Sequence, residues 1–240
     1  MHSCEIMSST PENQYYKVGV LLFHRADILD FTGPMEVLSH VSHNRNPDEP
    51  DRMFNIETIA QTSTVRAASA LTVKADTLIE DAIERLAEYD ILVVPGGPPS
   101  VLEPLINGDV PEVDIIRKFA ALPSPGPEKT RIIFSVCTGA FLLGAAGILS
   151  GVTVTTHHRA VDVLRDICAR FNDKNEPPTN VVHKRYIDGG HLVGGAVQVI
   201  TAGGISSGLD ATFHLVCQLA TPEMAAFVSR VMEYDWTVEK

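Results

Sequence analysis

The sequence predicts a single α/β domain with a mostly parallel central sheet and helices on both faces. Short apolar runs rich in β-branched residues alternate with helix-like stretches, which favours parallel strands joined by crossover helices. The apolar runs lack in-and-out alternation, as expected of strands that are covered on both faces. The chain has 240 residues, of which 45% are hydrophobic, and this is enough to build one large core.

Strands are expected wherever a short apolar run is bounded by turn residues. In the first half of the chain such runs occupy residues 17–23, 54–60, 90–97 and 131–137. Stretches with helical spacing of apolar residues lie between them, at residues 31–41, 77–89 and 110–122. The segment 122–130, LPSPGPEKT, contains three prolines and a glycine, so we expect a surface loop rather than a domain boundary there.

The second half continues the alternation and closes with two helices. A short strand, VTVTT, is expected at 152–156, followed by a helix near 159–170 and a polar break at 171–180. Glycine turns within residues 181–204 predict a hairpin, and the closing helices are expected at 205–220 and 222–236. We expect residues 1–15, which are polar, to form a disordered tail ahead of a single domain at 16–240.

Charge and cysteine content exclude several classes of partner and site. The net charge is −11 without a local Lys/Arg cluster, which argues against nucleic acids and anionic membranes and favours small molecules or other proteins. No apolar run approaches ~18 residues, and the N-terminus is not a secretory signal, so a reducing, cytoplasmic location is expected. The four cysteines are Cys4, Cys137, Cys168 and Cys217. They lie far apart in the sequence and lack the spacing of metal ligands, so we expect neither disulfides nor a metal site.

Cys137 is the candidate nucleophile. It follows a buried strand and precedes a small-residue helix that opens with Thr138, the strand–nucleophile–helix order of a strained elbow. The helix N-terminus is expected to lower the pKa of its thiol toward the thiolate. The alternative is a small buried cysteine without reactivity.

Two further loops are expected at the same edge of the sheet. The turn at Gly96 and Gly97 follows the strand at 90–97, and its amides are candidates for an oxyanion hole together with the amide after Cys137. Asp27, Asp30 and Glu36 follow the first strand. Asp30 stands out because its neighbours are apolar, and such surroundings raise the pKa of a carboxyl group and allow it to donate a proton. The alternative role for Asp30 is a helix N-cap.

Taken together, these loops resemble the ThiJ/PfpI superfamily. The residues that carry the resemblance are LDFTGPMEVL, DILVVPGG, SVCTGAFLLGAAGIL, VTTHH and ITAGGISSGLD, which extend over most of the chain. The resemblance implies a flavodoxin-like three-layer sandwich with a nucleophile elbow. It also implies a homodimer, with the first-helix and elbow loops as the seat of the partner.

Within this superfamily the chain is similar to the isonitrile hydratases. The resemblance implies that Cys137 is the nucleophile, Asp30 its acidic partner, and Gly97 with the Thr138 amide the oxyanion site. It also points to Asp27 and to His157, which follows VTT; His158 stands where hydratases carry Trp. Thr138, where protease-like relatives have His, argues against peptidase activity.

The implied reaction is the addition of water to an isonitrile to give an N-formamide, without cofactor or metal. Cys137 attacks the terminal carbon, while Asp30 supplies a proton and then activates water. Two alternatives remain open, a glyoxalase-like hydratase acting on a carbonyl adduct and a non-enzymatic redox sensor or ligand-binding protein that uses Cys137. The region 171–200 is longer than in bacterial hydratases, which is expected to reshape a substrate or dimer face.

Overall fold

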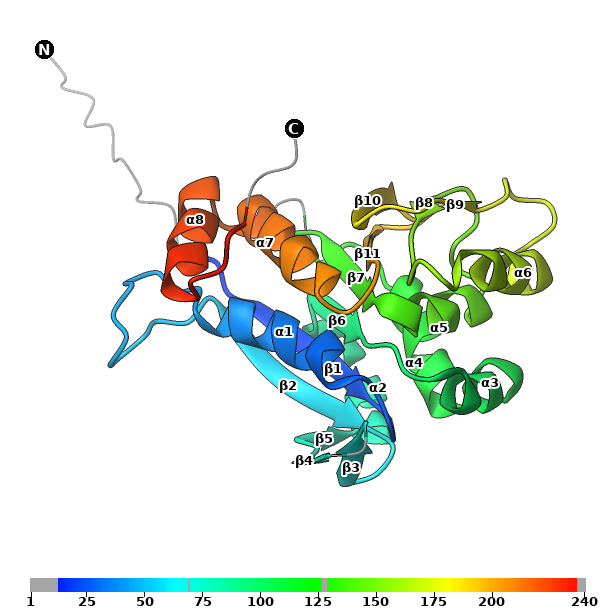
Figure 1. The fold of residues 1–240 in the computed structure, drawn as a ribbon, viewed down its shortest axis with the longest axis horizontal. Helices are drawn as coiled ribbons and strands as arrows, with labels where there is room; N and C mark the ends of the chain where they lie inside the picture. Colours follow the sequence, from blue (N-terminus) through cyan, green and yellow to red (C-terminus); the bar gives the residue numbers. More distant parts are fainter. Residues whose placement is uncertain (1–12, 69, 127–128, 237–240) are drawn as a thin grey trace, which may run out of the picture.

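The computed structural model describes residues 13–68, 70–126 and 129–236. Its centre is a seven-stranded sheet, whose place between the helices can be followed in Figure 1. The strands follow the order β10-β11-β7-β6-β1-β2-β5. Their bounds are β1 Tyr16–Leu22, β2 Phe54–Ala60, β5 Thr77–Leu78, β6 Ile91–Val94, β7 Arg131–Val136, β10 Tyr186–His191 and β11 Val197–Ala202.

All neighbours in this sheet are parallel except β10, which pairs antiparallel with β11 at one edge. The predicted mostly parallel α/β sheet and the hairpin within 181–204 are therefore confirmed. The chain leaves β1 toward β2 on one side and later continues to β6 on the other. The strand order thus reverses between β1 and β6, the kind of position where open parallel sheets bind ligands.

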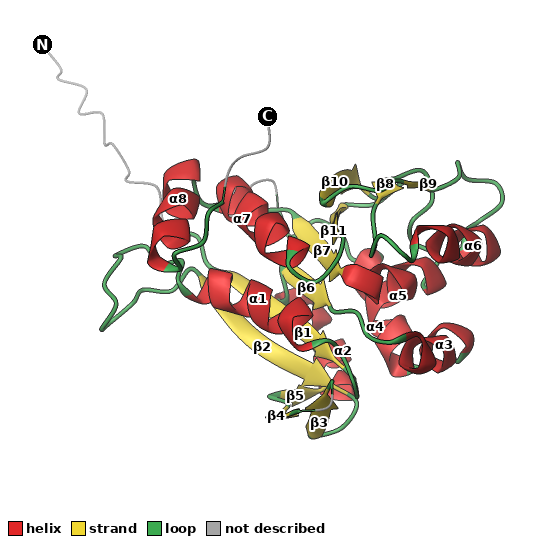
Figure 2. Ribbon diagram, viewed as in Figure 1, coloured by secondary structure: helices red, strands yellow, loops and turns green. Residues whose placement is uncertain are grey.

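Helices cover both faces, as Figure 2 shows. One face carries α1 (Ile28–Ser39), α7 (Ser207–Leu219) and α8 (Pro222–Val231). The other carries five helices: α2 Ile79–Glu84, α3 Pro99–Asn107, α4 Pro111–Ala120, α5 Ala140–Ala145 and α6 Val161–Phe171. Each face has its own cluster of buried side chains, so the sheet is apolar on both sides, which explains why its strands lack alternation.

Several elements differ from the expectations. The short strands β3 (Thr64–Ala67) and β4 (Leu71–Lys74) form an unpredicted antiparallel pair. The expected helix at 77–89 is divided into α2 and a 3₁₀ turn, η1 (Leu86–Glu88). The unpredicted helix α3 contains Pro99 in its first turn and Pro104 within it, and prolines of this kind suggest a loop in a sequence. Its core contact through Leu102, which is fully buried, outweighs that preference.

The remaining expectations concern the tail and the loops. The predicted tail at 1–15 falls largely outside the described residues, and β1 begins at Tyr16. A pair of two-residue strands, β8 (Thr153–Val154) and β9 (Asn180–Val181), flanks α6 and the polar break after it. Across residues 13–236, apart from the gaps at 69 and 127–128, no helix has the length and apolar character needed to cross a bilayer.

Candidate active site

Cys137 lies in a strained turn directly after β7. Its φ angle is +58°, in the left-handed region of the backbone that residues other than glycine adopt only at an energetic cost. The residue begins a 3₁₀ turn, η2 (Cys137–Gly139), which leads into α5. A Cβ atom at Gly139 would lie 2.3 Å from the carbonyl oxygen of Val94, so glycine is required for the turn to pack against the end of β6. The predicted elbow is thus present, and its strain is supported by the neighbouring strand.

Asp30 lies in the first turn of α1 and is completely buried. Its Oδ2 accepts a hydrogen bond of 2.9 Å from the amide of Gly96. Its Oδ1 is buried without a conventional hydrogen-bond partner among the residues that the structure describes. The N-cap alternative for Asp30 is wrong, because Asp27 occupies the N-cap position of α1, and the Asp27 side chain makes no capping bond.

The surroundings of Asp30 raise its pKa from 3.8 to about 7. Burial is the main cause of the rise. The hydrogen bond from the Gly96 amide opposes it, the negative charge of Asp27 adds a smaller rise, and the hydrogen bond with Cys137 lowers the pKa least. The predicted rise is therefore present in the structure. Of the apolar neighbours expected to cause it, Phe31 is buried, whereas Leu29 is 40% exposed.

Cys137, Asp27 and Asp30 form one cluster, in which one ligand atom from each lies within 4.8 Å of the other two. Burial, followed by the charge of Asp30, raises the pKa of the Cys137 thiol to about 12. The expected lowering of this pKa is wrong, because α5 has only six residues and its effect is exceeded by burial and two carboxyl groups. At rest the cluster holds a thiol, and a proton acceptor stands beside it.

A cation is poorly suited to this cluster, although three ligand-type atoms converge there. Metal ligation requires deprotonated groups, and the raised pKa values of Asp30 and Cys137 favour their protonated forms. Oδ2 of Asp30 is moreover already bonded to the Gly96 amide. The cluster is better suited to moving protons than to holding an ion.

Thr138 ties the elbow to the turn after β6. Its hydroxyl donates to the carbonyl of Gly97 at 2.9 Å, and the Gly97 amide donates back to the hydroxyl at 3.0 Å. Both amides of the Gly96–Gly97 turn thus have hydrogen-bond partners, and the oxyanion role expected of Gly97 stays a prediction. The Thr138 amide hydrogen-bonds to Cys137 and lowers the pKa of its thiol.

His157 lies near Asp27 of the cluster, and His158 lies next to His157. His157 is half-buried and interacts electrostatically with Asp27, while His158 is exposed, with its ring centroid 4.3 Å from that of His157. Burial, with His158 and Arg159 nearby, lowers the pKa of His157. In the described part of the chain neither histidine hydrogen-bonds to Cys137, so the structure does not make either one its direct base.

Sequence reasoning missed two contacts that build the site. The Thr156 hydroxyl donates to the carbonyl oxygen of Cys137 at 2.8 Å, which links the segment after β8 to the elbow. A Cβ atom at Gly96 would lie 2.6 Å from Oγ1 of Thr138 and 2.9 Å from Oδ2 of Asp30, so only glycine brings its amide to the carboxyl group. A glycine after one strand and an acid embedded among apolar residues after another were the available signals for this contact.

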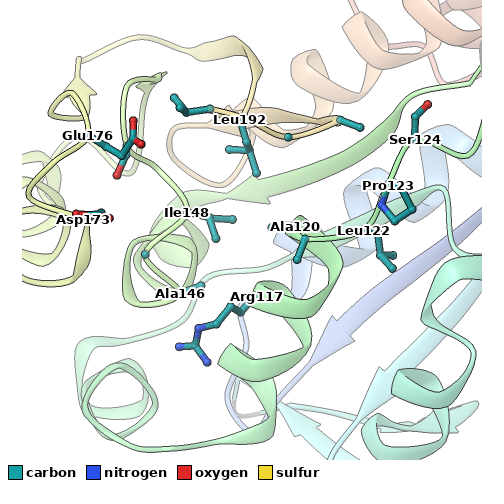
Figure 3. Close-up of a pocket in the computed structure, with 17 residues that line it drawn as sticks. Arg117, Ala120, Leu122, Pro123, Ser124, Ala146, Ile148, Asp173, Glu176 and Leu192 are labelled. Carbon is teal, nitrogen blue, oxygen red and sulfur yellow. The ribbon is translucent and has the colours of Figure 1, made fainter.

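A cavity of about 550 Å³ adjoins the cluster. It reaches Leu29, next to Asp30, and Thr156, which is bonded to Cys137. A second, larger cavity of about 720 Å³ lies elsewhere, between α4, α5 and the turn joining β10 to β11 (Figure 3). Arg117 is on one side of it and Asp173 and Glu176 are on another. None of the predicted site residues lines the larger cavity.

The chain is similar in sequence and in fold to known proteins. The chain is 31% identical over 218 residues to isonitrile hydratase of Pseudomonas putida, covering 91% of this chain and 78% of the relative. A ThiJ/PfpI family protein from Pseudomonas syringae has a similar structure, with a TM-score of 0.71, 19% identity, and coverage of 100% of this chain and 84% of that one. Oxidized DJ-1 of Toxoplasma gondii gives a TM-score of 0.65 at 17% identity, covering 92% of this chain and 100% of that one.

The similarities also identify the family of this chain. The two solved structures show the flavodoxin-like fold that the resemblance implied. The sequence profile of the DJ-1/PfpI family matches residues 16–216, which include the strands, the elbow and the cluster around Cys137. The chain belongs to the DJ-1/PfpI family.

Proposed function

We propose that this protein adds water to an isonitrile, R–N≡C, to give the N-formamide R–NH–CHO. The observation that carries the proposal is the buried Asp30 carboxyl, with a pKa of about 7, in one cluster with the Cys137 thiol. The 31% identity to an isonitrile hydratase supports the same reaction. A carboxyl group that titrates near neutral pH is suited to taking and giving the protons that this hydration requires.

In the first step, the Cys137 sulfur bonds to the terminal isonitrile carbon. The thiol proton passes to Asp30 as the sulfur attacks, and Asp30 delivers it to that same carbon. The product is a thioimidate, R–N=CH–S–Cys137, which has gained the thiol hydrogen and no other atom. Because the pKa of the thiol is about 12, the proton leaves the sulfur only when a substrate is there to receive the electron pair.

In the second step, water adds across the C=N bond of the thioimidate. Asp30, as the carboxylate, takes one water proton while the oxygen bonds to carbon, and the nitrogen receives that proton. The C–S bond of the resulting R–NH–CH(OH)–S–Cys137 then breaks, and the hydroxyl proton returns to the sulfur. The formamide leaves and the thiol is restored, so no cofactor is consumed.

The burial of Cys137 favours this reaction over redox sensing. Sensor cysteines are accessible and have a low pKa, because the thiolate is the species that reacts with oxidants. Cys137 is only 4% exposed, and the pKa of its thiol is raised. In the proposed reaction such a thiol is activated by a partner, Asp30, as the substrate binds.

The test is the production of N-formamide from simple alkyl isonitriles by the purified protein and its variants. We expect turnover in the wild type, its loss in Cys137→Ala, and a loss of roughly 10²-fold or more in Asp30→Asn, which keeps an acceptor for the Gly96 amide but not the transferable proton. Cys217→Ser, on α7, is the matched cysteine control and should retain full activity.

Two outcomes would overturn the proposal. One is an absence of isonitrile turnover together with turnover of methylglyoxal, which would favour the glyoxalase-like alternative. The other is turnover in Cys137→Ala equal to that of the wild type, which would leave the cluster without a role in the reaction.

A further inference from the structure

The cavity beside the cluster is lined by cationic and histidine side chains. Twelve residues line it, and none of them is acidic: Leu29, Thr156, His157, His158, His183, Lys184, Arg185, Gly203, Gly204, Ile205, Ser206 and Ser207. This composition contrasts with the net charge of −11 for the whole chain. Basic groups gathered in one cavity of an acidic protein indicate that the cavity receives negative charge.

Lys184 supplies the uncompensated charge of this cavity. Its side chain is exposed and makes no ion pair within the described ranges. Arg185, by contrast, is paired with Asp210. A lysine that is not in an ion pair can bind an anionic ligand without breaking an existing interaction.

The backbone that carries Lys184 is held by a fully buried hydroxyl. Thr155 Oγ1 donates to the carbonyl of Lys184 at 3.1 Å and accepts from the Lys184 amide at 3.3 Å. The Thr155 amide in turn donates to Oγ1 of Thr201 on β11, at 2.8 Å. The lysine is therefore anchored to the same sheet that positions Cys137, because β11 pairs with β7.

A divalent metal does not account for the histidines of this cavity. The ring centroids of His157 and His158 are 4.3 Å apart, and those of His158 and His183 are 6.3 Å apart. In the part of the chain that the structure describes, the group of three ligand atoms within 4.8 Å of one another is Asp27, Asp30 and Cys137, and it includes no histidine. The three rings instead offer nitrogen atoms that can hydrogen-bond to an anion.

We propose that this cavity binds the carboxylate of the substrate, so that the protein acts on isonitriles that carry a carboxylate group. The inference rests on the proposed function, since the isonitrile carbon must reach Cys137 while the far end of the molecule lies in the cavity. Thr156 joins the two places, because it lines the cavity and hydrogen-bonds to the Cys137 carbonyl. Lys184 and the histidines are assigned to the carboxylate, and Asp30 and Cys137 to the isonitrile.

The first arm of the test compares charged and neutral substrates. The substrates are isocyanoacetate and its one-carbon-longer homologue, each measured beside its methyl ester. We expect the acid of at least one pair to have the higher kcat/KM. In Lys184→Glu the ratio of acid to ester should fall roughly five-fold or more, mainly through KM, because a repulsive charge replaces an attractive one.

The matched control is Lys174→Glu. Lys174 is also an exposed lysine without an ion pair in the described ranges, but it lies in the loop after α6 and does not line this cavity. The substitution changes the net charge by the same amount, so it reports any general effect of the protein's field. We expect the acid-to-ester ratio of this variant to equal that of the wild type.

The second arm measures binding without turnover. N-formylglycine and its methyl ester, the products expected from the first substrate pair, are titrated while the histidine ring resonances are followed by NMR. We expect N-formylglycine to bind more tightly than its ester and to shift the resonances of His157, His158 and His183. Lys184→Glu should remove this preference, and Lys174→Glu should keep it.

The two arms separate the failure of this inference from that of the proposed function. Isonitrile turnover with no preference for either acid, together with equal binding of N-formylglycine and its ester, overturns the carboxylate assignment and leaves the hydratase intact. Preferential binding of N-formylglycine without hydration of any isonitrile overturns the proposed function and leaves an anion-binding cavity.

Discussion

The carboxyl groups of Asp30 and Asp27 both raise the pKa of the Cys137 thiol, in buried surroundings where a charge is poorly solvated. Asp30 titrates first, near neutral pH, because the pKa of the thiol lies far above it. Above about pH 7 the cluster keeps its last proton on the sulfur at rest. In the proposed reaction, attack on the substrate carbon transfers this proton to Asp30, so that the two groups share a single proton.

The pH dependence of turnover follows from this order. We expect kcat/KM for an isonitrile to rise with pH and to level off, with a midpoint near 7, because the Asp30 carboxylate is the form that accepts the thiol proton. The negative charge of Asp27 contributes to the raised pKa of Asp30. Asp27→Asn should therefore move the midpoint to lower pH. Steady-state kinetics from pH 5 to 9 measure the shift.

Glu36→Gln is the control for this prediction. Glu36 is an exposed carboxylate on the same helix, α1, and pairs with His40 instead of facing the cluster. Its removal should leave the midpoint unchanged. A pH profile that is identical in the wild type and in Asp27→Asn would show that the limb belongs to a group other than Asp30.

Among the elements, the turn after β6 and the elbow after β7 hold one another in place. Gly139 lets the elbow approach Val94, and Gly96 lets its amide approach Asp30. The reciprocal hydrogen bonds between Thr138 and Gly97 complete the junction. Three chain segments, following β1, β6 and β7, thereby fix the acid relative to the thiol.

Gly96→Ala should separate catalysis from stability at this junction. The added Cβ would lie within 2.7 Å of the Thr138 amide nitrogen and 2.9 Å from Oδ2 of Asp30, so the carboxyl group must move. We expect kcat to fall roughly 100-fold, the scale of loss that follows from misplacing a reacting group by about 1 Å. Turnover of an alkyl isonitrile and thermal unfolding are measured together.

Gly195→Ala is the matched control, because the nearest heavy atom to its added Cβ would be 3.5 Å away and the residue lies in the other cavity. It should keep wild-type activity. If Gly96→Ala retains full turnover, the Gly96 amide does not position Asp30.

The strands and helices around the site differ in how far the sequence predicts them. The elbow and the strands around it were predictable, because small residues directly after a buried apolar run are typical of a tight strand-to-helix turn. Helix α3 was not, since Pro99 and Pro104 suggest a loop and only the burial of Leu102 against the core overrides them. The direction of the Cys137 pKa shift was also out of reach, because it depends on how deeply the thiol is buried and on the distance to two carboxyl groups.

On the scale of the whole molecule, the site is assembled where the strand order reverses. Asp30 follows β1, Gly96 follows β6 and Cys137 follows β7, and these three strands are neighbours in the sheet. The alternation of strands and helices already predicts that these loops share one edge. It does not predict which of their polar atoms meet, and the hydrogen bond from the Gly97 amide to the Thr138 hydroxyl is an example.

We also propose that the protein is a homodimer. Leu29 on α1 and Ile205 before α7 are 40% and 44% exposed, and both lie beside the cavity that adjoins Cys137. Sedimentation at micromolar concentration should give twice the chain mass of 26.0 kDa. Leu29→Glu should shift the protein toward the monomer, because it places a charge in an apolar contact.

Leu71→Glu is the comparison for this prediction, since Leu71 on β4 is exposed to a similar extent, 38%. It should leave the dimer intact. A wild-type protein that sediments as a monomer at these concentrations contradicts the proposal.

The burial of Asp30 has a consequence for the stability of the fold. A carboxyl group whose pKa is about 7 in the folded chain and 3.8 in the unfolded chain binds protons more tightly when folded. The unfolding free energy is therefore highest below about pH 4 as far as this group is concerned, and it declines as the pH rises toward 7, by an amount on the order of a few kcal/mol. At neutral pH and above, the protein carries in its core a charge that favours unfolding. Selection for thermal stability alone would favour replacing Asp30 with a neutral residue. Selection for a carboxyl group that transfers a proton retains Asp30, and other contacts must then supply the lost stability.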